Sequence, residues 1–174
     1  MGKGVTVWFT GLPCCGKTTI ADRVAEILKA EGRKVERLDG DTVRKGLTSD
    51  LGFSKEDRNE NIKRVTFVAK LLTRNDVIVL ATFVSPYEAR RVKTREEIGE
   101  FMLVYVKAPV EVCIERDVKG MYKKALAGEI KNFTGVDDPY EEPASPKLVV
   151  ETDKETLEES VQKVLIKMKE LGYL

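Results

Sequence analysis

The segment Gly11–Thr18 has the residue types and spacing of a phosphate-binding loop: two glycines separated by four residues, then lysine and threonine. A glycine-rich backbone can curl so that successive N–H groups point at phosphate oxygens. Lys17 can reach the β- and γ-phosphates of a nucleotide, and the Thr18 hydroxyl can ligate Mg²⁺. The predicted ATP-binding residues are Gly11, Leu12, Pro13, Cys14, Cys15, Gly16, Lys17, Thr18 and Thr19.

The sequence on both sides of this loop supports the interpretation. Residues 5–10 form an apolar run typical of a strand, and residues 19–25 have the pattern of a helix. The helix adds the positive end of its dipole to the phosphate site. A glycine-rich turn without a ligand is the alternative, but the strand–loop–helix context favours nucleotide binding.

Two carboxylates, Asp39 and Asp41, follow the strand predicted at residues 35–38. One carboxylate can hold Mg²⁺ directly or through water, and the other can accept a proton from an attacking hydroxyl. Asp-Gly is also a common turn dipeptide, so a plain turn is the alternative. Beside a phosphate loop we favour the functional interpretation.

Arg44, Arg58 and Asn61 come next along the chain. Arg58 and Asn61 are three positions apart on a predicted helix, so they share a face. Arginine suits bidentate recognition of phosphate or sulfate oxygens. For each of these charges, an ordinary surface role is the alternative.

Ser85 follows the strand predicted at residues 76–83, at the same edge of the sheet. Its hydroxyl could cap a helix or turn, bind an acceptor, or be phosphorylated. We favour binding, because direct phosphoryl transfer needs positioning and charge neutralisation rather than a protein nucleophile. In a later loop, Lys119 could close over the transferred group and Phe133 could stack on a base, although a solvated basic loop is the alternative.

Alternating strands and helices predict an α/β fold of the P-loop NTPase type: a parallel sheet flanked by helices on both faces, with a lid segment. We predict one domain over residues 1–174. Two long polar stretches, residues 40–56 and 119–146, break the alternation, and the second is predicted to be the lid. The predicted strands span residues 5–10, 35–38, 76–83, 101–106 and 148–150, and the predicted helices residues 19–25, 57–74, 86–98, 109–117 and 154–171.

Composition narrows the classes of function. A net charge of +1 over 174 residues gives no global field that would attract nucleic acid. The apolar runs are too short to span a bilayer, and no signal peptide precedes the first strand. We therefore expect a cytoplasmic protein without a nucleic-acid or membrane partner.

The chain has three cysteines, which form neither a disulfide framework nor a zinc spacing. Cys14 and Cys15 are interpreted as small residues that fit the phosphate loop. The alternative is a nucleotide site that is sensitive to oxidation. Cys113 lies in an apolar predicted helix and is expected to be buried.

Several blocks of the sequence resemble the adenylyl-sulfate kinase family, and one of them begins Asp-Gly-Asp-Thr-Val-Arg at residue 39. Together they cover nearly the whole chain in order and are far more specific than a phosphate loop. The resemblance implies transfer of the γ-phosphoryl group of ATP to the 3′-hydroxyl of adenylyl sulfate, with Mg²⁺, in sulfate assimilation. The blocks span residues 39–47, 50–54, 57–62, 83–87, 116–125 and 128–141.

The same resemblance implies roles for individual residues. Thr18 and Asp39 are implied as Mg²⁺ ligands, and Asp41 as the group that handles the acceptor hydroxyl. The implied catalytic residues are Lys17, Asp41, Ser85 and Lys119. The implied acceptor-binding residues are Asp41, Arg44, Phe53, Arg58, Asn61, Val84, Ser85, Lys119 and Phe133.

The chain departs from the family pattern at two places. Pro13-Cys14-Cys15 stands where the family usually has Ser-Gly-Ala or similar, and the proline removes one N–H from the phosphate cradle. Glu88 stands where the family commonly has arginine, which puts any ligand or lid contact from that position in question.

The resemblance also bears on partners. Family members are commonly homodimers, and some are fused to a sulfate adenylyltransferase, so we expect a homodimer and a functional link to that enzyme. The alternatives are another small-molecule P-loop kinase or a catalytically silent nucleotide-binding regulatory domain.

Overall fold

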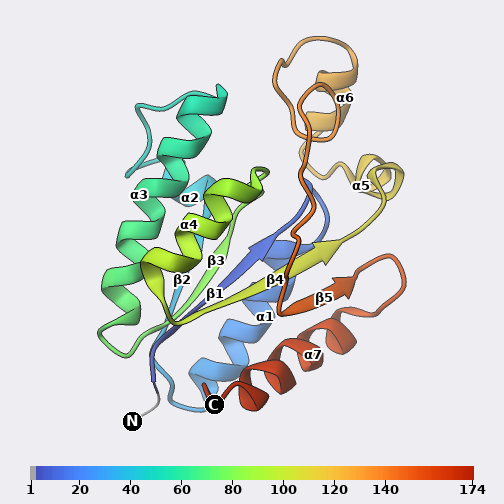
Figure 1. Ribbon diagram of the computed structural model, residues 1–174. Helices are drawn as coiled ribbons and strands as arrows, with labels where there is room; N and C mark the ends of the chain where they lie inside the picture. Colours follow the sequence, from blue (N-terminus) through green and yellow to red (C-terminus); the bar gives the residue numbers. More distant parts are fainter. Residues whose placement is uncertain (1–2) are drawn as a thin grey trace.

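Five parallel strands form a single sheet in the order β2-β3-β1-β4-β5, and the computed structural model describes residues 3–174 (Figure 1). The strands are β1 (Val5–Thr10), β2 (Val35–Asp39), β3 (Ile78–Thr82), β4 (Phe101–Lys107) and β5 (Leu148–Glu151). The helices are α1 (Lys17–Ala30), α2 (Gly40–Arg44), α3 (Lys55–Thr73), α4 (Glu88–Ile98), α5 (Val110–Arg116), α6 (Met121–Leu126) and α7 (Leu157–Glu170). Within the described part of the chain, no helix has both the length and the apolar character needed to cross a membrane.

Helices cover both faces of the sheet: α1 and α7 pack on one face, α3 and α4 on the other (Figure 1). Side chains of a strand alternate between the two faces, and β1 shows the result. Val5, Val7 and Phe9 are buried with α1 and α7, whereas Trp8 is buried with α3 and α4. This central parallel strand is therefore buried on both faces and is mostly apolar. The predicted α/β fold with helices on both faces is confirmed.

Side-chain caps decide where two helices begin. Ser54 accepts a hydrogen bond from Asp57 N at 3.0 Å, so α3 begins slightly earlier than its apolar spacing predicted. Thr156 and Glu159 form a reciprocal capping box, so α7 begins later than predicted. The hydrophobic pattern thus located the helices, and the caps set their ends.

Both long polar stretches contain a short helix that their composition did not predict. Asp39 accepts a hydrogen bond from Asp41 N at 3.0 Å and caps α2. Gly120, in the left-handed conformation at φ 66°, precedes α6. The segment 119–146 also returns to the end of β1, where the Tyr140 and Thr10 hydroxyls lie 2.8 Å apart. Its role as a lid stays a prediction.

Candidate active site

The phosphate loop between β1 and α1 has the close backbone packing expected of its glycines. A Cβ at Gly11 would lie 2.3 Å from Val106 O, so no other residue fits there. Gly16 has φ 103°, in the left-handed region, immediately before α1. The buried Lys17 ammonium donates to Gly11 O at 2.9 Å and to Leu12 O at 2.7 Å. Both of these acceptors are neutral carbonyl oxygens, so neither of them is a counter-ion that would compete with a phosphate.

The two cysteines of the loop have different surroundings. Cys15 is fully buried, and its Sγ lies 3.6 Å from Lys17 Nζ. Cys14 is partly exposed and has φ 62°. Both thiols are free, as is the buried thiol of Cys113. This packing supports the interpretation of Cys15 as a small filler of the loop.

Residues to which the sequence assigned no role form hydrogen bonds that reach the backbone of the phosphate loop. Arg116 donates to Thr152 Oγ1 at 3.0 Å, and that hydroxyl donates to Cys15 O at 2.7 Å. Tyr122 donates to Pro13 O at 2.9 Å. Arg116 and Tyr122 lie in a block that resembles the family, which could have pointed to them. Thr152 follows β5 and carries no such signal.

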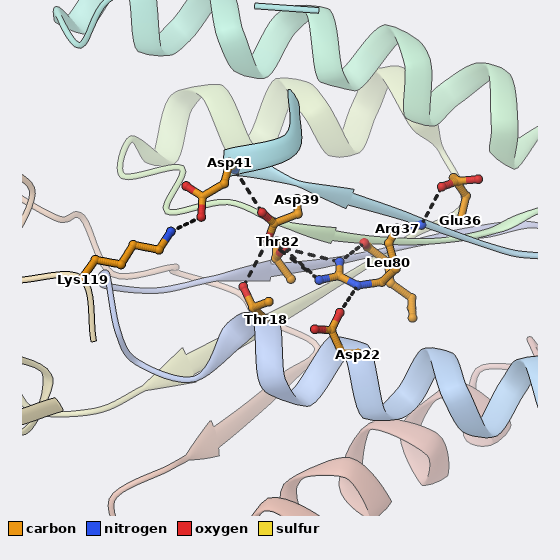
Figure 2. A network of polar contacts seen from close by, with 9 residues as sticks. All are labelled: Thr18, Asp22, Glu36, Arg37, Asp39, Asp41, Leu80, Thr82 and Lys119. Atoms are coloured by element: carbon orange, nitrogen blue, oxygen red, sulfur yellow. Dashed lines mark hydrogen bonds and ion pairs between the residues drawn. The ribbon is translucent and has the colours of Figure 1, made fainter. Parts of the chain in front are cut away.

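Asp39, at the end of β2, is the centre of a polar network that reaches the phosphate loop (Figure 2). Its Oδ2 accepts from Thr18 Oγ1 at 3.1 Å and from Thr82 Oγ1 at 2.8 Å, while Oδ1 accepts from Asp41 N. Burial alone raises the pKa of this carboxyl group. The three hydrogen bonds and the nearby charge of Arg37 outweigh burial, so the pKa of Asp39 lies below its usual value. The site thus holds an ionised, oriented carboxylate.

Asp41 and Lys119, 78 residues apart in sequence, form an ion pair at the same edge of the sheet (Figure 2). Both side chains are mainly exposed. The hydrogen bond to Asp41 raises the pKa of Lys119, which keeps the ammonium charged. The fold thus places a carboxylate and a cation beside Asp39.

Thr18 and Asp39 fit a Mg²⁺ site that a nucleotide would complete. A hydroxyl and a carboxylate oxygen lie 3.1 Å apart, and both are hard donors. Mg²⁺ is commonly held by one or two carboxylates together with substrate phosphates and water. Among residues 3–174, no group of three or more His, Cys, Asp or Glu side chains could hold a metal by itself.

The residues predicted to bind the acceptor include a cluster at the start of α3. The Arg44 guanidinium lies 4.2 Å from the centroid of the Phe53 ring, which is 56% exposed. Arg58 donates to Phe53 O at 2.9 Å and also to Thr134 Oγ1. Arg58 thereby joins α3 to the segment predicted as the lid. Direct contact of these arginines with a ligand stays a prediction.

Three other predicted acceptor residues have different surroundings. Asn61 is 5% exposed, and within residues 3–174 its Oδ1 is the one buried side-chain N or O atom without a hydrogen-bond partner. Phe133 packs edge-on against Tyr122, with ring centroids 5.0 Å apart. The carbonyl of Val84 accepts from Thr10 Oγ1 at 2.7 Å. Because an unpaired buried amide oxygen is costly, Asn61 is the member of this set most in need of a partner.

Ser85 lies just after β3, but its hydroxyl is directed into the protein. The residue is 4% exposed and has φ 41°. Trp8 Nε1 donates to Ser85 Oγ at 3.0 Å, and Thr10 Oγ1 lies 3.1 Å away as an acceptor. The hydroxyl is therefore buried and hydrogen-bonded on both sides, which supports direct transfer over a phosphoserine intermediate.

We expect Ser85→Ala to keep kcat within about threefold of the wild type, because in-line transfer needs no protein nucleophile. The variant should lose about 1–3 kcal/mol of unfolding free energy, since the Trp8 N–H loses its acceptor. Steady-state kinetics and urea denaturation measure the two effects. The wild-type protein, incubated with Mg·ATP and analysed by mass spectrometry, should carry no phosphoryl group on Ser85. Its presence would contradict this expectation.

Glu88, the second departure from the family pattern, holds the end of the segment 119–146. Its carboxylate pairs with Arg91 at 2.6 Å and accepts from Ala144 N at 3.2 Å. Arg91 is 2% exposed and also donates to Ser85 O at 2.5 Å. The acidic residue thus neutralises a buried arginine and contacts the predicted lid.

The sheet order, the phosphate loop after β1 and the two carboxylates at and just after the end of β2 define a P-loop nucleotide-binding protein of the kinase class. A sequence model of the family described as adenylylsulphate kinase matches residues 3–151. The chain belongs to the adenylylsulphate kinase family, as the resemblance predicted.

Relatives in sequence and structure agree with this assignment. An adenylyl-sulfate kinase from Halothermothrix orenii is 62% identical over 99% of this chain and 93% of its own. The Mycobacterium tuberculosis APS kinase, solved in complex with AMPPNP and APS, is 40% identical with a TM-score of 0.93, covering 97% of this chain and 99% of that one. A hexameric APS kinase from Thiobacillus denitrificans is 34% identical with a TM-score of 0.78, covering 99% of this chain and 30% of that one.

Proposed function

We propose that this kinase transfers the γ-phosphoryl group of ATP to the 3′-hydroxyl of adenylyl sulfate. The products are ADP and 3′-phosphoadenylyl sulfate, made in sulfate assimilation. One observation carries the proposal: hydrogen bonds run from Thr18 of the phosphate loop through Asp39 and Asp41 to Lys119. These contacts support a single site that contains both the phosphate loop and residues implied for the acceptor. The relative solved with both AMPPNP and APS supports the same pair of substrates.

The residues of this network, together with Lys17 and two arginines, have distinct roles in the proposed transfer. Lys17 neutralises charge that develops on the β- and γ-phosphates. Thr18 and Asp39 would hold Mg²⁺, which when bound neutralises phosphate charge. Asp41 accepts the proton of the acceptor hydroxyl, and Lys119 positions that carboxylate. Arg44 and Arg58 supply cations for the phosphosulfate group of the acceptor.

The decisive experiment measures ADP release with ATP, Mg²⁺ and either adenylyl sulfate or AMP. We expect kcat/KM to favour adenylyl sulfate by about 10²-fold or more, because AMP leaves groups that recognise the sulfate unpaired. Equal or faster turnover of AMP would indicate another small-molecule kinase. Binding of both substrates without ADP release would indicate a silent regulatory domain.

The remaining proposals concern assembly and location. The chain forms a homodimer, and the hexameric relative supports association among such kinases. Light scattering in solution tests this assembly. The proposed location is the cytoplasm, and the three free thiols fit its reducing conditions. A sulfate adenylyltransferase would supply the acceptor, which is the basis of the proposed functional link.

A further inference from the structure

Arg37 precedes Asp39 by two residues in β2. The two side chains lie on the same face of the strand, because side chains two residues apart share a face. Its side chain is only 15% exposed. Its Nε donates to Asp22 Oδ1 at 2.8 Å, and one amino group donates to Leu80 O at 2.6 Å (Figure 2). These two contacts fix the position of the guanidinium, and both of its amino groups lie near Thr82.

The strand register places Arg37 opposite Leu80, and Asp39 opposite Thr82. Both amino groups of Arg37 lie 3.4 Å from Thr82 Oγ1. Guanidinium can only donate, so it occupies the acceptor side of this hydroxyl. The single hydroxyl proton of Thr82 is then directed to Asp39 Oδ2, 2.8 Å away.

We infer that Arg37 is a positioning residue that acts through Thr82 to fix the Asp39 carboxylate for the proposed Mg²⁺ site. The direct attraction between Arg37 and Asp39 is weaker than the hydrogen bond from Thr82 to Asp39, since the charged groups of Arg37 and Asp39 approach only to 3.9 Å. Asp22 neutralises the guanidinium from its far side, at 2.8 Å. Removing a residue that orients a metal ligand typically lowers metal affinity or activity by about 10–100-fold.

The inference rests on the metal site of the proposed function, so its test measures metal binding rather than turnover. Mn²⁺ serves as the probe, and electron paramagnetic resonance of free Mn²⁺ reports its binding to the complex of the protein with ADP. We expect Arg37→Gln to weaken Mn²⁺ binding by about tenfold. Arg23→Gln is the matched control, because Arg23 pairs with Glu26 and Glu158 on the exposed side of α1. It should bind Mn²⁺ within about twofold of the wild type.

A double-mutant cycle identifies the route of the effect. If Arg37 acts through the Thr82 hydroxyl, Thr82→Val should weaken Mn²⁺ binding to a similar degree, and the double variant should be little worse than either single one. Arg37→Lys should restore less than half of the lost binding free energy, because an ammonium cannot span Asp22 and Thr82 as the planar fork does. Fully additive losses would overturn the inference, as would an Arg37→Gln variant that binds Mn²⁺ as tightly as the wild type.

Two further outcomes are informative. If Arg37→Gln fails to fold, Asp22→Asn replaces it, since Asp22 is 56% exposed and the variant only releases the guanidinium. A loss of Mn²⁺ affinity of about threefold or more in that variant supports the inference, and no loss overturns it. If the wild type with ADP binds no Mn²⁺, the proposed metal site itself fails. If the acceptor is a compound other than adenylyl sulfate, all of these Mn²⁺ measurements are unaffected.

Discussion

Lys17→Ala should lower kcat by about 10²–10³-fold, the usual effect of removing one preorganised donor from a site where charge develops. The Lys17 ammonium is buried in the phosphate loop and bonded to Gly11 O and Leu12 O. As phosphoryl transfer proceeds, charge on the β- and γ-phosphate oxygens would lose its nearest positioned cation. Single-turnover measurements with saturating ATP and adenylyl sulfate isolate this step.

Lys29→Ala is the matched control, because Lys29 is an exposed lysine in the last turn of the same helix. It should leave kcat within about twofold of the wild type. Circular dichroism of both variants shows whether α1 remains intact. Normal kcat in a folded Lys17→Ala variant would remove Lys17 from the transfer mechanism.

Asp41→Asn should lower kcat by about 10²–10⁴-fold, the range typical of a lost general base. Asparagine keeps the size of the side chain but cannot take up a proton from the acceptor hydroxyl. Because Asp41 is 68% exposed in the first turn of α2, the change should hardly affect folding. The KM for adenylyl sulfate should stay within about threefold, since binding and proton transfer are separate contributions.

The control for this variant is Asp76→Asn, at the opposite edge of the sheet. Asp76 precedes β3 and has φ 61°, a conformation that asparagine also adopts readily. It should have wild-type kcat and KM. If Asp41→Asn raised the acceptor KM at unchanged kcat, Asp41 would be a binding residue rather than the base.

Much of the fold could be predicted from local patterns. The continuous apolar runs of the central strands identified a parallel sheet covered on both faces, and helical spacing located the main helices. The helix ends at Ser54 and Thr156 were missed, because each depends on one side-chain hydrogen bond rather than on periodicity. The short helices α2 and α6 were missed for a similar reason: their sequences are short and polar.

The candidate site was less predictable where its contacts join distant segments. The pairing of Asp41 with Lys119 spans 78 residues, and no local pattern encodes such a contact. Arg116 and Thr152 hold the phosphate loop from α5 and from the end of β5. The burial of Ser85 against Trp8 depends on how β3 lies beside β1, a matter of strand register.

The sequence by itself determined the phosphate loop, because the residues Gly11–Thr18 are contiguous and their backbone geometry follows from glycine and from the flanking strand and helix. It also determined family membership, through blocks that extend along nearly the whole chain. Only the tertiary structure decided how Asp39 is held. Thr18 lies in α1 and Thr82 in β3, and only the packed fold brings both hydroxyls within hydrogen-bonding distance of the Asp39 carboxylate at the end of β2.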